Sequence, residues 1–124
     1  MKIYKTQEEV NADIVDGVLS IKGDVRFEFS LKIQASINVE AGNIDAWDIN
    51  AAGNINIDAW GNINAAGNIN AGGNIEARGN IDAGNVLFYA VCFAYISFVC
   101  KSVKGRRNNS KYFCLDSDVQ IKSE

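Results

Sequence analysis

The tripeptide Gly-Asn-Ile or Gly-Asn-Val occurs seven times between Gly42 and Val86, and an isoleucine returns every six residues from Ile57 to Ile81. On an α-helix, six residues advance by about 600°, so successive isoleucines would point in different directions. In a strand, the isoleucine and the alanine two residues later share one face, and the Asn, Asp or Glu between them points the other way. The repeat therefore predicts short strands joined by bends and excludes a helical array.

Short strands that stack at the sheet spacing of about 4.8 Å form a β-solenoid. Three six-residue units make one coil of about 18 residues, so residues 18 apart are expected to stack directly. The expected pairs are Ile63 with Ile81, Ile57 with Ile75, and Trp60 with Arg78. The Gly-Asn pair is expected at each corner because both residues tolerate positive φ. The fold class is all-β, with isoleucine and alanine inside and Asn/Asp ladders outside.

The chain is expected to form one domain over residues 1–124. Residues 1–17 carry a capping box at Thr6–Glu9 and end at Asp16-Gly17, which predicts a short amphipathic helix over the open end of the solenoid. Residues 18–86 form the repeat solenoid. Residues 87–124 form terminal strands with a basic turn at 101–111.

Residues 86–100 are an apolar run in which Ser97 is the only clearly polar residue. The run is shorter than the about 20 residues that a membrane span needs, and it is rich in β-branched and aromatic residues. We expect strands buried on both faces or covered by the terminal segment, without a membrane span. The open alternative is membrane association helped by the adjacent basic residues.

The composition argues against most enzyme classes. The 124 residues include no histidine, which removes the commonest general base and the commonest metal ligand. The three cysteines, Cys92, Cys100 and Cys114, match no zinc or redox spacing. We therefore expect a protein that is not an enzyme and that has no cofactor and no metal. Reduced thiols and a charged N-terminal segment predict a cytoplasmic location.

Charge is unevenly distributed along the chain. Residues 34–85 hold six acidic residues and one basic residue, a balance of −5, whereas residues 101–111 hold five basic residues and no acidic one. The acidic side chains Asp45, Asp58 and Asp82 are expected to point outward and to form a ladder that could occupy a basic groove of a partner. The alternative is a solvated face that only keeps the solenoid soluble.

The basic turn is the second candidate surface. Its charged residues could contact phosphates, with a neighbouring aromatic ring for stacking, or the turn is merely a solvated loop. These residues are Lys101, Lys104, Arg106, Arg107 and Lys111. Trp47 and Trp60 occupy equivalent places after an alanine, and each either forms part of an interface or packs over a corner.

The Gly-Asn-Ile-x-Ala unit of residues 39–86 resembles the repeat of bactofilins, polymer-forming bacterial cytoskeletal proteins. This resemblance implies a right-handed β-helix and self-assembly. A looser similarity is to pentapeptide-repeat proteins that mimic duplex DNA. Hexapeptide-repeat acyltransferases share the period of six, but their small residue precedes the aliphatic one and they use a catalytic histidine.

These observations favour a non-enzymatic binding protein that blocks a protein or nucleoprotein partner, in the style of a phage or mobile-element anti-defence inhibitor such as an anti-CRISPR. Direct nucleic-acid contact through the basic turn stays open, as do a monomer and a homo-oligomer. The alternative function is a bactofilin-like self-assembling scaffold.

Overall fold

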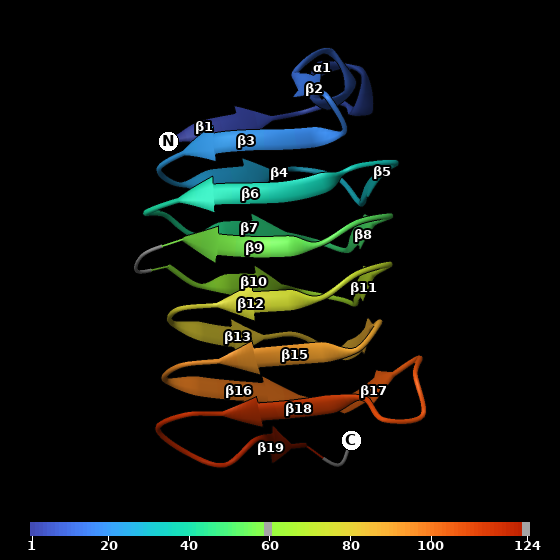
Figure 1. The fold of residues 1–124 in the computed structure, drawn as a ribbon. Helices are drawn as coiled ribbons and strands as arrows, with labels where there is room; N and C mark the ends of the chain where they lie inside the picture. Colours follow the sequence, from blue (N-terminus) through green and yellow to red (C-terminus); the bar gives the residue numbers. More distant parts are fainter. Residues whose placement is uncertain (59–60, 123–124) are drawn as a thin grey trace.

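The computed structural model describes residues 1–58 and 61–122. The chain forms a β-solenoid of about six turns, which confirms the predicted all-β architecture. The strands in front run from right to left and those behind run from left to right while the chain descends, so the coil is right-handed (Figure 1).

Three sheets form the sides of the solenoid, and all strand pairs are parallel except β2 with β3. Sheet 1 consists of β1 (Lys2–Tyr4), β4 (Val25–Phe27), β7 (Ile44–Ala46), β10 (Ile63–Ala65), β13 (Asn80–Asp82), β16 (Ser97–Cys100) and β19 (Gln120–Ile121). Sheet 2 consists of β2 (Ile14–Val15), β3 (Val18–Lys22), β6 (Ser36–Glu40), β9 (Ile55–Asp58), β12 (Ile75–Ala77), β15 (Val91–Ala94) and β18 (Lys111–Cys114). Sheet 3 consists of β5 (Leu31–Ile33), β8 (Ile49–Ala51), β11 (Ile69–Ala71), β14 (Asn85–Phe88) and β17 (Ser102–Gly105).

The core is a set of aliphatic columns that run along the solenoid axis. Ile44, Ile63 and Ile81 stack in sheet 1, and each is fully buried. Alanines such as Ala46 and Ala65 form the neighbouring column, where the interior is narrow. This arrangement follows from the period of two in each strand, which places Ile and Ala on one face.

Of the two expected isoleucine pairs with a spacing of 18 residues, the structure contains one. Ile63 lies opposite Ile81, as predicted. The expectation for Ile57 is wrong, because Ile75 lies opposite Ile55. The eight-residue unit of residues 53–60 thus keeps its first isoleucine, Ile55, in register. The expected pair of Trp60 with Arg78 lies outside the described residues.

The reason for glycine at the corners differs from the one expected. Positive φ occurs among the described residues only at Asp16, Gly17, Gly23 and Ala41, none of which belongs to a Gly-Asn pair. A Cβ on Gly61 would instead collide with the carbonyl oxygen of Gly42 in the preceding coil. Glycine is therefore required by the close approach of successive coils.

Most corner asparagines bind the backbone of the next coil, whereas Asn80 and Asn85 accept hydrogen bonds from the hydroxyls of Ser97 and Ser102. The Asn43 Oδ1 accepts a hydrogen bond from the Asn62 N–H at 2.9 Å, and the Asn62 Oδ1 accepts one from the Asn80 N–H at 2.7 Å. A second corner repeats the pattern, since the Asn54 Oδ1 accepts from the Asn74 N–H at 2.7 Å. These corner ladders were not predicted from the sequence, and they satisfy backbone donors that the bends leave unpaired.

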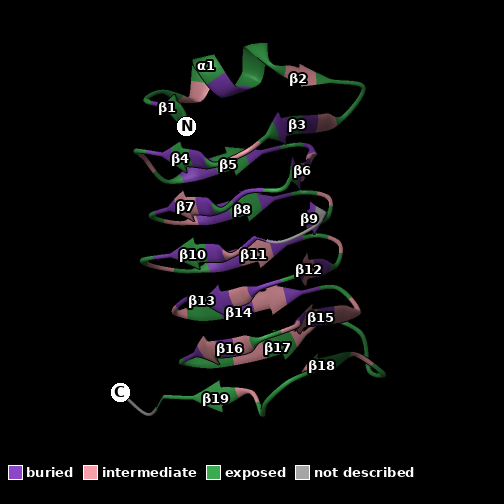
Figure 2. Cartoon of the chain, turned by 90° about the vertical axis from the view of Figure 1, so that its left-hand side faces the viewer, coloured by how far each residue is buried: buried purple, intermediate pink, exposed green. Residues whose placement is uncertain are grey.

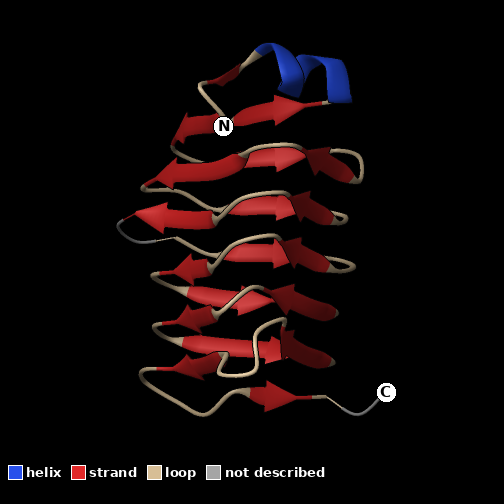
Figure 3. Ribbon diagram, turned by 45° about the vertical axis from the view of Figure 1, so that its right-hand side comes forward, coloured by secondary structure: helices blue, strands red, loops and turns tan. Residues whose placement is uncertain are grey.

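The N-terminal end is covered by α1 (Gln7–Ala12) (Figure 3). The Thr6–Glu9 capping box is present as expected, and Val10 of the helix is fully buried. The helix is shorter than expected. Residues 2–4 form β1, and Asp16-Gly17, both with positive φ, form the turn of a hairpin between β2 and β3.

Residues 86–100 form a further coil, so the expectation that they are buried on both faces is wrong. Phe88, Cys92 and Phe98 point into the core. The strand residues that alternate with the inward ones are only half-buried on the outside, namely Leu87, Val91, Phe93 and Val99. Figure 2 shows this as intermediate colouring along β14 and β16. No helix within residues 1–58 and 61–122 is long and apolar enough to cross a membrane.

Candidate functional site

The acidic residues do not form one ladder. Asp45 and Asp82 share the outward column of sheet 1, but Asn64 lies between them. The Asp45 Oδ2 also pairs with the Arg26 Nε at 3.6 Å. Asp58 belongs to sheet 2, where it lies opposite Glu40 of β6, and its side chain lies outside the described part. The acidic surface is therefore divided between two sides of the solenoid.

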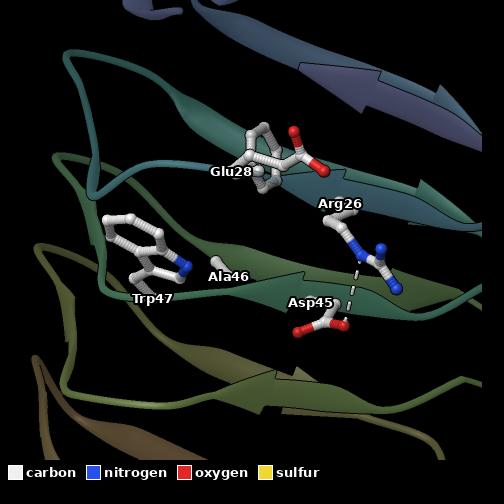
Figure 4. A pocket seen from close by; sticks show the side chains of 6 residues that line it. Arg26, Glu28, Asp45, Ala46 and Trp47 are labelled. Carbon is white, nitrogen blue, oxygen red and sulfur yellow. Dashed lines mark ion pairs between the residues drawn. The ribbon is translucent and has the colours of Figure 1, made fainter. Parts of the chain in front are cut away.

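Trp47 follows β7 and borders an open pocket with Arg26, Glu28 and Asp45 (Figure 4). The indole is 60% exposed and covers no other aromatic ring in the described part of the chain. Of the two alternatives for this tryptophan, exposure fits an interface residue better than a packed corner. The corresponding prediction for Trp60 lies outside the described residues.

The basic residues of the predicted turn lie at several places around the last coil. Lys101 follows β16 at one corner, and Lys104 points outward from β17. Arg106 and Arg107 belong to the loop between β17 and β18, and Lys111 begins β18. All five side chains are exposed. The loop protrudes from the lower part of the solenoid (Figure 1).

The two arginines of this loop have different surroundings. The Arg106 guanidinium donates hydrogen bonds of 2.6 Å to the Ala71 carbonyl oxygen and to the Asn70 Oδ1, so it fastens the loop to the outside of sheet 3. The Arg107 guanidinium lies 5.5 Å from the centre of the Tyr89 ring. Arg107 is therefore the more available of the two for a partner.

A cluster of outward apolar side chains on sheet 2 was not identified from the sequence. We call Val91, Phe93, Tyr95 and Phe113 the aromatic face. The Phe93 and Phe113 rings stack at 5.1 Å with an interplanar angle of 2°, and Tyr95 stacks beside Phe93 at 5.9 Å. Phe113 is 38% exposed, and the other three side chains are half-buried.

Cations border the aromatic face. The Arg78 guanidinium lies 5.9 Å from the centre of the Tyr95 ring, and Lys111 is the first residue of β18 below Val91. Arg78 also pairs with Glu76 at 3.6 Å between Nε and Oε2. The surface thus has an apolar centre and a largely basic rim, a composition typical of binding surfaces.

The outward columns change character along the solenoid. In sheet 2, the outward residues Ser20, Asn38, Asn56 and Glu76 are followed by Phe93 and Phe113. In sheet 3, Asn50 and Asn70 are followed by Leu87. The polar exterior of the repeat coils therefore ends at residue 85.

Comparison with family models, with curated proteins and with solved structures found no match to this chain. The functional argument for this chain therefore depends on its own surface chemistry.

The thiols of Cys92 and Cys100 offer little reactivity. Burial raises the pKa of Cys92, and burial also raises the pKa of Cys100. A thiol with a raised pKa holds less of the nucleophilic thiolate at neutral pH. Within residues 1–58 and 61–122, no three Cys, Asp or Glu side chains are grouped closely enough to hold a metal ion.

A signal for the aromatic face exists in the sequence. The alternation of inward and outward residues continues from the repeat into residues 86–100, with Phe88, Cys92 and Phe98 in the inward columns. Extending that alternation would have placed Phe93 outside. This alternation is not visible in the hydrophobicity of residues 86–100, because their inward and outward residues are both apolar.

Proposed function

We propose that this protein is a rigid, non-enzymatic module that binds a protein partner through the aromatic face and thereby blocks it. The observation that carries the proposal is the exchange of outward Asn and Glu for Phe93 and Phe113 in one column of sheet 2. Exposed aromatic groups cost solubility without stabilising the core, and clustered aromatic and arginine side chains are typical of interface hot spots.

The ring geometry favours a protein over single-stranded nucleic acid. A stacking platform for bases presents ring faces to the solvent. The Phe93 and Phe113 rings stack on each other, so the ring faces that meet are not available for stacking with a base. The basic residues Arg78 and Lys111 at the rim suit a partner surface with an apolar centre and acidic borders.

An inhibitor of the anti-defence type is the specific role that we propose. The support is a hydrogen-bonded solenoid whose binding surface lies on strands and so loses little conformational freedom on binding. A bactofilin-like scaffold is the second candidate, supported by the repeat unit and by exposed apolar side chains at the C-terminal end of the solenoid. Helix α1 over the other end counts against head-to-tail growth.

The test is affinity capture with three immobilised proteins: the wild type, Phe93→Asn, and the control Asn64→Ser on the outside of sheet 1. Asparagine already occupies the Phe93 column at Asn38 and Asn56, so the fold is expected to tolerate it. We expect the wild type and the control to capture at least one protein. The captured amount of that protein should be about tenfold lower with Phe93→Asn. Equal capture by all three would contradict the proposal. If oligothymidine bound the wild type but not Phe93→Asn in a fluorescence anisotropy assay, the partner of the aromatic face would be a nucleic acid and not a protein.

A further inference from the structure

We propose that the last coil pairs with the last coil of a second copy, so that the chain forms a closed, two-fold symmetric dimer. This dimer is independent of the proposed partner on the aromatic face. Its evidence lies in the inward columns, the free strand edges and the charges at the two corners of β18.

The inward columns of the last coil are uncovered. Tyr112 lies directly below Cys92 in one column and is 44% exposed, whereas Cys92 is fully buried. Ile121 lies below Cys100 and is 50% exposed, whereas Cys100 is fully buried. These two side chains would be buried by a further layer, and their exposure leaves an apolar surface at this end.

The three strands of the last coil also have a free edge. β17, β18 and β19 are the outermost strands of sheets 3, 2 and 1. Free edges present unpaired backbone N–H and C=O groups that can pair with another strand. At the opposite end α1 covers sheet 3, where the Gln7 Oε1 accepts a hydrogen bond from the Lys32 N–H at 3.2 Å. The helix thus covers the first strand of sheet 3, whereas at the last coil all three edge strands are free among the described residues.

Two identical open ends meet most simply about a two-fold axis. We place this axis beside the free edge of β18, level with the middle of the strand and perpendicular to sheet 2, so that β18 lies antiparallel to its copy across the axis. The axis exchanges the two corners that flank β18, which Figure 1 shows at the lower right and lower left. Each corner of one copy then faces the opposite corner of the other.

The charges at these corners are complementary. The corner before β18 carries Arg106, Arg107 and Lys111, and the corner after it carries Asp116 and Asp118. The proposed axis brings the basic corner of each copy against the acidic corner of its partner, twice per dimer. Complementary charges of this kind fix the orientation of an interface and disfavour other arrangements. A second copy is thus the occupant that fits this end.

The dimer would also enlarge the aromatic face. Phe113 lies on β18, next to the proposed axis, and continues the column of Phe93. The two copies would place their Phe93–Phe113 columns end to end across the axis, on one side of the assembly. A partner with two-fold symmetry would then meet two equivalent binding surfaces.

The experiment uses two charge reversals of the full chain. Variant one is Arg107→Glu with Lys111→Glu, and variant two is Asp116→Lys with Asp118→Lys. Arg106 is left unchanged because it fastens its loop to Ala71 and Asn70. Each variant alone would place like charges at both corner contacts, whereas the mixture of the two variants would restore opposite charges at both.

Sedimentation equilibrium and light scattering measure the result. We expect the wild type to have twice the mass of the 13.5 kDa chain and each variant alone to dimerise about tenfold more weakly. The equimolar mixture should recover the dimer, which unfolding of a variant could not produce. The control Lys22→Glu with Lys32→Glu makes the same change of charge on earlier coils and should remain dimeric. A monomeric wild type, longer oligomers, or a mixture that fails to recover would each overturn the proposal.

Discussion

The repeat coils of residues 42–83 and the coil of residues 85–105 both have an apolar inward surface, but their outward surfaces differ. Ile69 on β11 and Val86 on β14 occupy one inward column, and both are buried. Beside them, Asn70 and Leu87 occupy one outward column, and an amide is replaced by an aliphatic side chain. The inward residues therefore determine the fold, whereas the outward residues are free to change with function.

The corners of the two regions differ as well. In the repeat coils, Gly-Asn at each corner combines close approach with a side-chain hydrogen bond, as at Gly61-Asn62. The coil of residues 85–105 has Tyr89-Ala90 and Tyr95-Ile96 at two of its corners, with Tyr89 43% exposed. The Gly-Asn corner is therefore a property of the repeat coils and is not required at every corner of the solenoid.

The largest expected effect comes from placing a charge in the shared inward column. Ile69→Asp and Val86→Asp should each lower the free energy of unfolding by more than about 4 kcal/mol, because an unpaired carboxylate would be buried in a narrow core. Thermal unfolding followed by circular dichroism measures this loss. Asn64→Ser on the outward face of β10 serves as the control and should leave the melting temperature nearly unchanged. If Val86→Asp were tolerated, residues 85–105 would not share the inward surface of the repeat coils.

A smaller loss is expected from filling the space between two corners. Gly61→Ala should cost about 1–3 kcal/mol, because the new Cβ would overlap the Gly42 carbonyl oxygen. Denaturant unfolding of the variant measures the cost. Ala66→Ser changes the exposed residue before the next corner glycine and should cost far less. A neutral Gly61→Ala would mean that the coils separate easily at this corner.

The sequence was sufficient to predict the solenoid because the alternation of Ile and Ala with polar residues is compatible only with strands. The register was harder to predict, because an eight-residue unit such as residues 53–60 can place its surplus at either end. Only the observed pairing of Ile75 with Ile55 decides between them. The role of glycine was misjudged because positive φ and close approach both require glycine, and the sequence does not distinguish them.

The candidate surfaces could be predicted only in part. Exposure of Trp47 and of the basic residues around Arg107 follows from their places at corners and in a loop. The aromatic face was missed because neither face of residues 86–100 is polar, so their composition resembles that of a strand buried on both sides. The division of the acidic residues between sheets 1 and 2 depends on the lengths of the units, which determine the face that each residue occupies.

A modest effect is expected from changing the outward surface itself. Phe93→Asn removes the ring contacts with Phe113 and Tyr95 and should lower stability by about 1 kcal/mol. The same variant should lose partner capture, so that its effect on binding exceeds its effect on stability. A melting temperature that falls as far as that of Ile69→Asp would show that Phe93 belongs to the core.

The smallest effect is expected from neutralising the acids of the outward column of sheet 1. Asp45→Asn with Asp82→Asn should change stability by no more than about 0.5 kcal/mol, because both side chains lie at the surface and the ion pair of Asp45 with Arg26 is solvated. The variant should also retain the partner, since Asn64 already interrupts the two acids and the aromatic face lies on another sheet. Capture is measured in parallel with Phe93→Asn at low and at physiological salt. If the acidic variant lost the partner while Phe93→Asn kept it, the binding surface would lie on sheet 1, and Trp47 beside Asp45 would become its central residue.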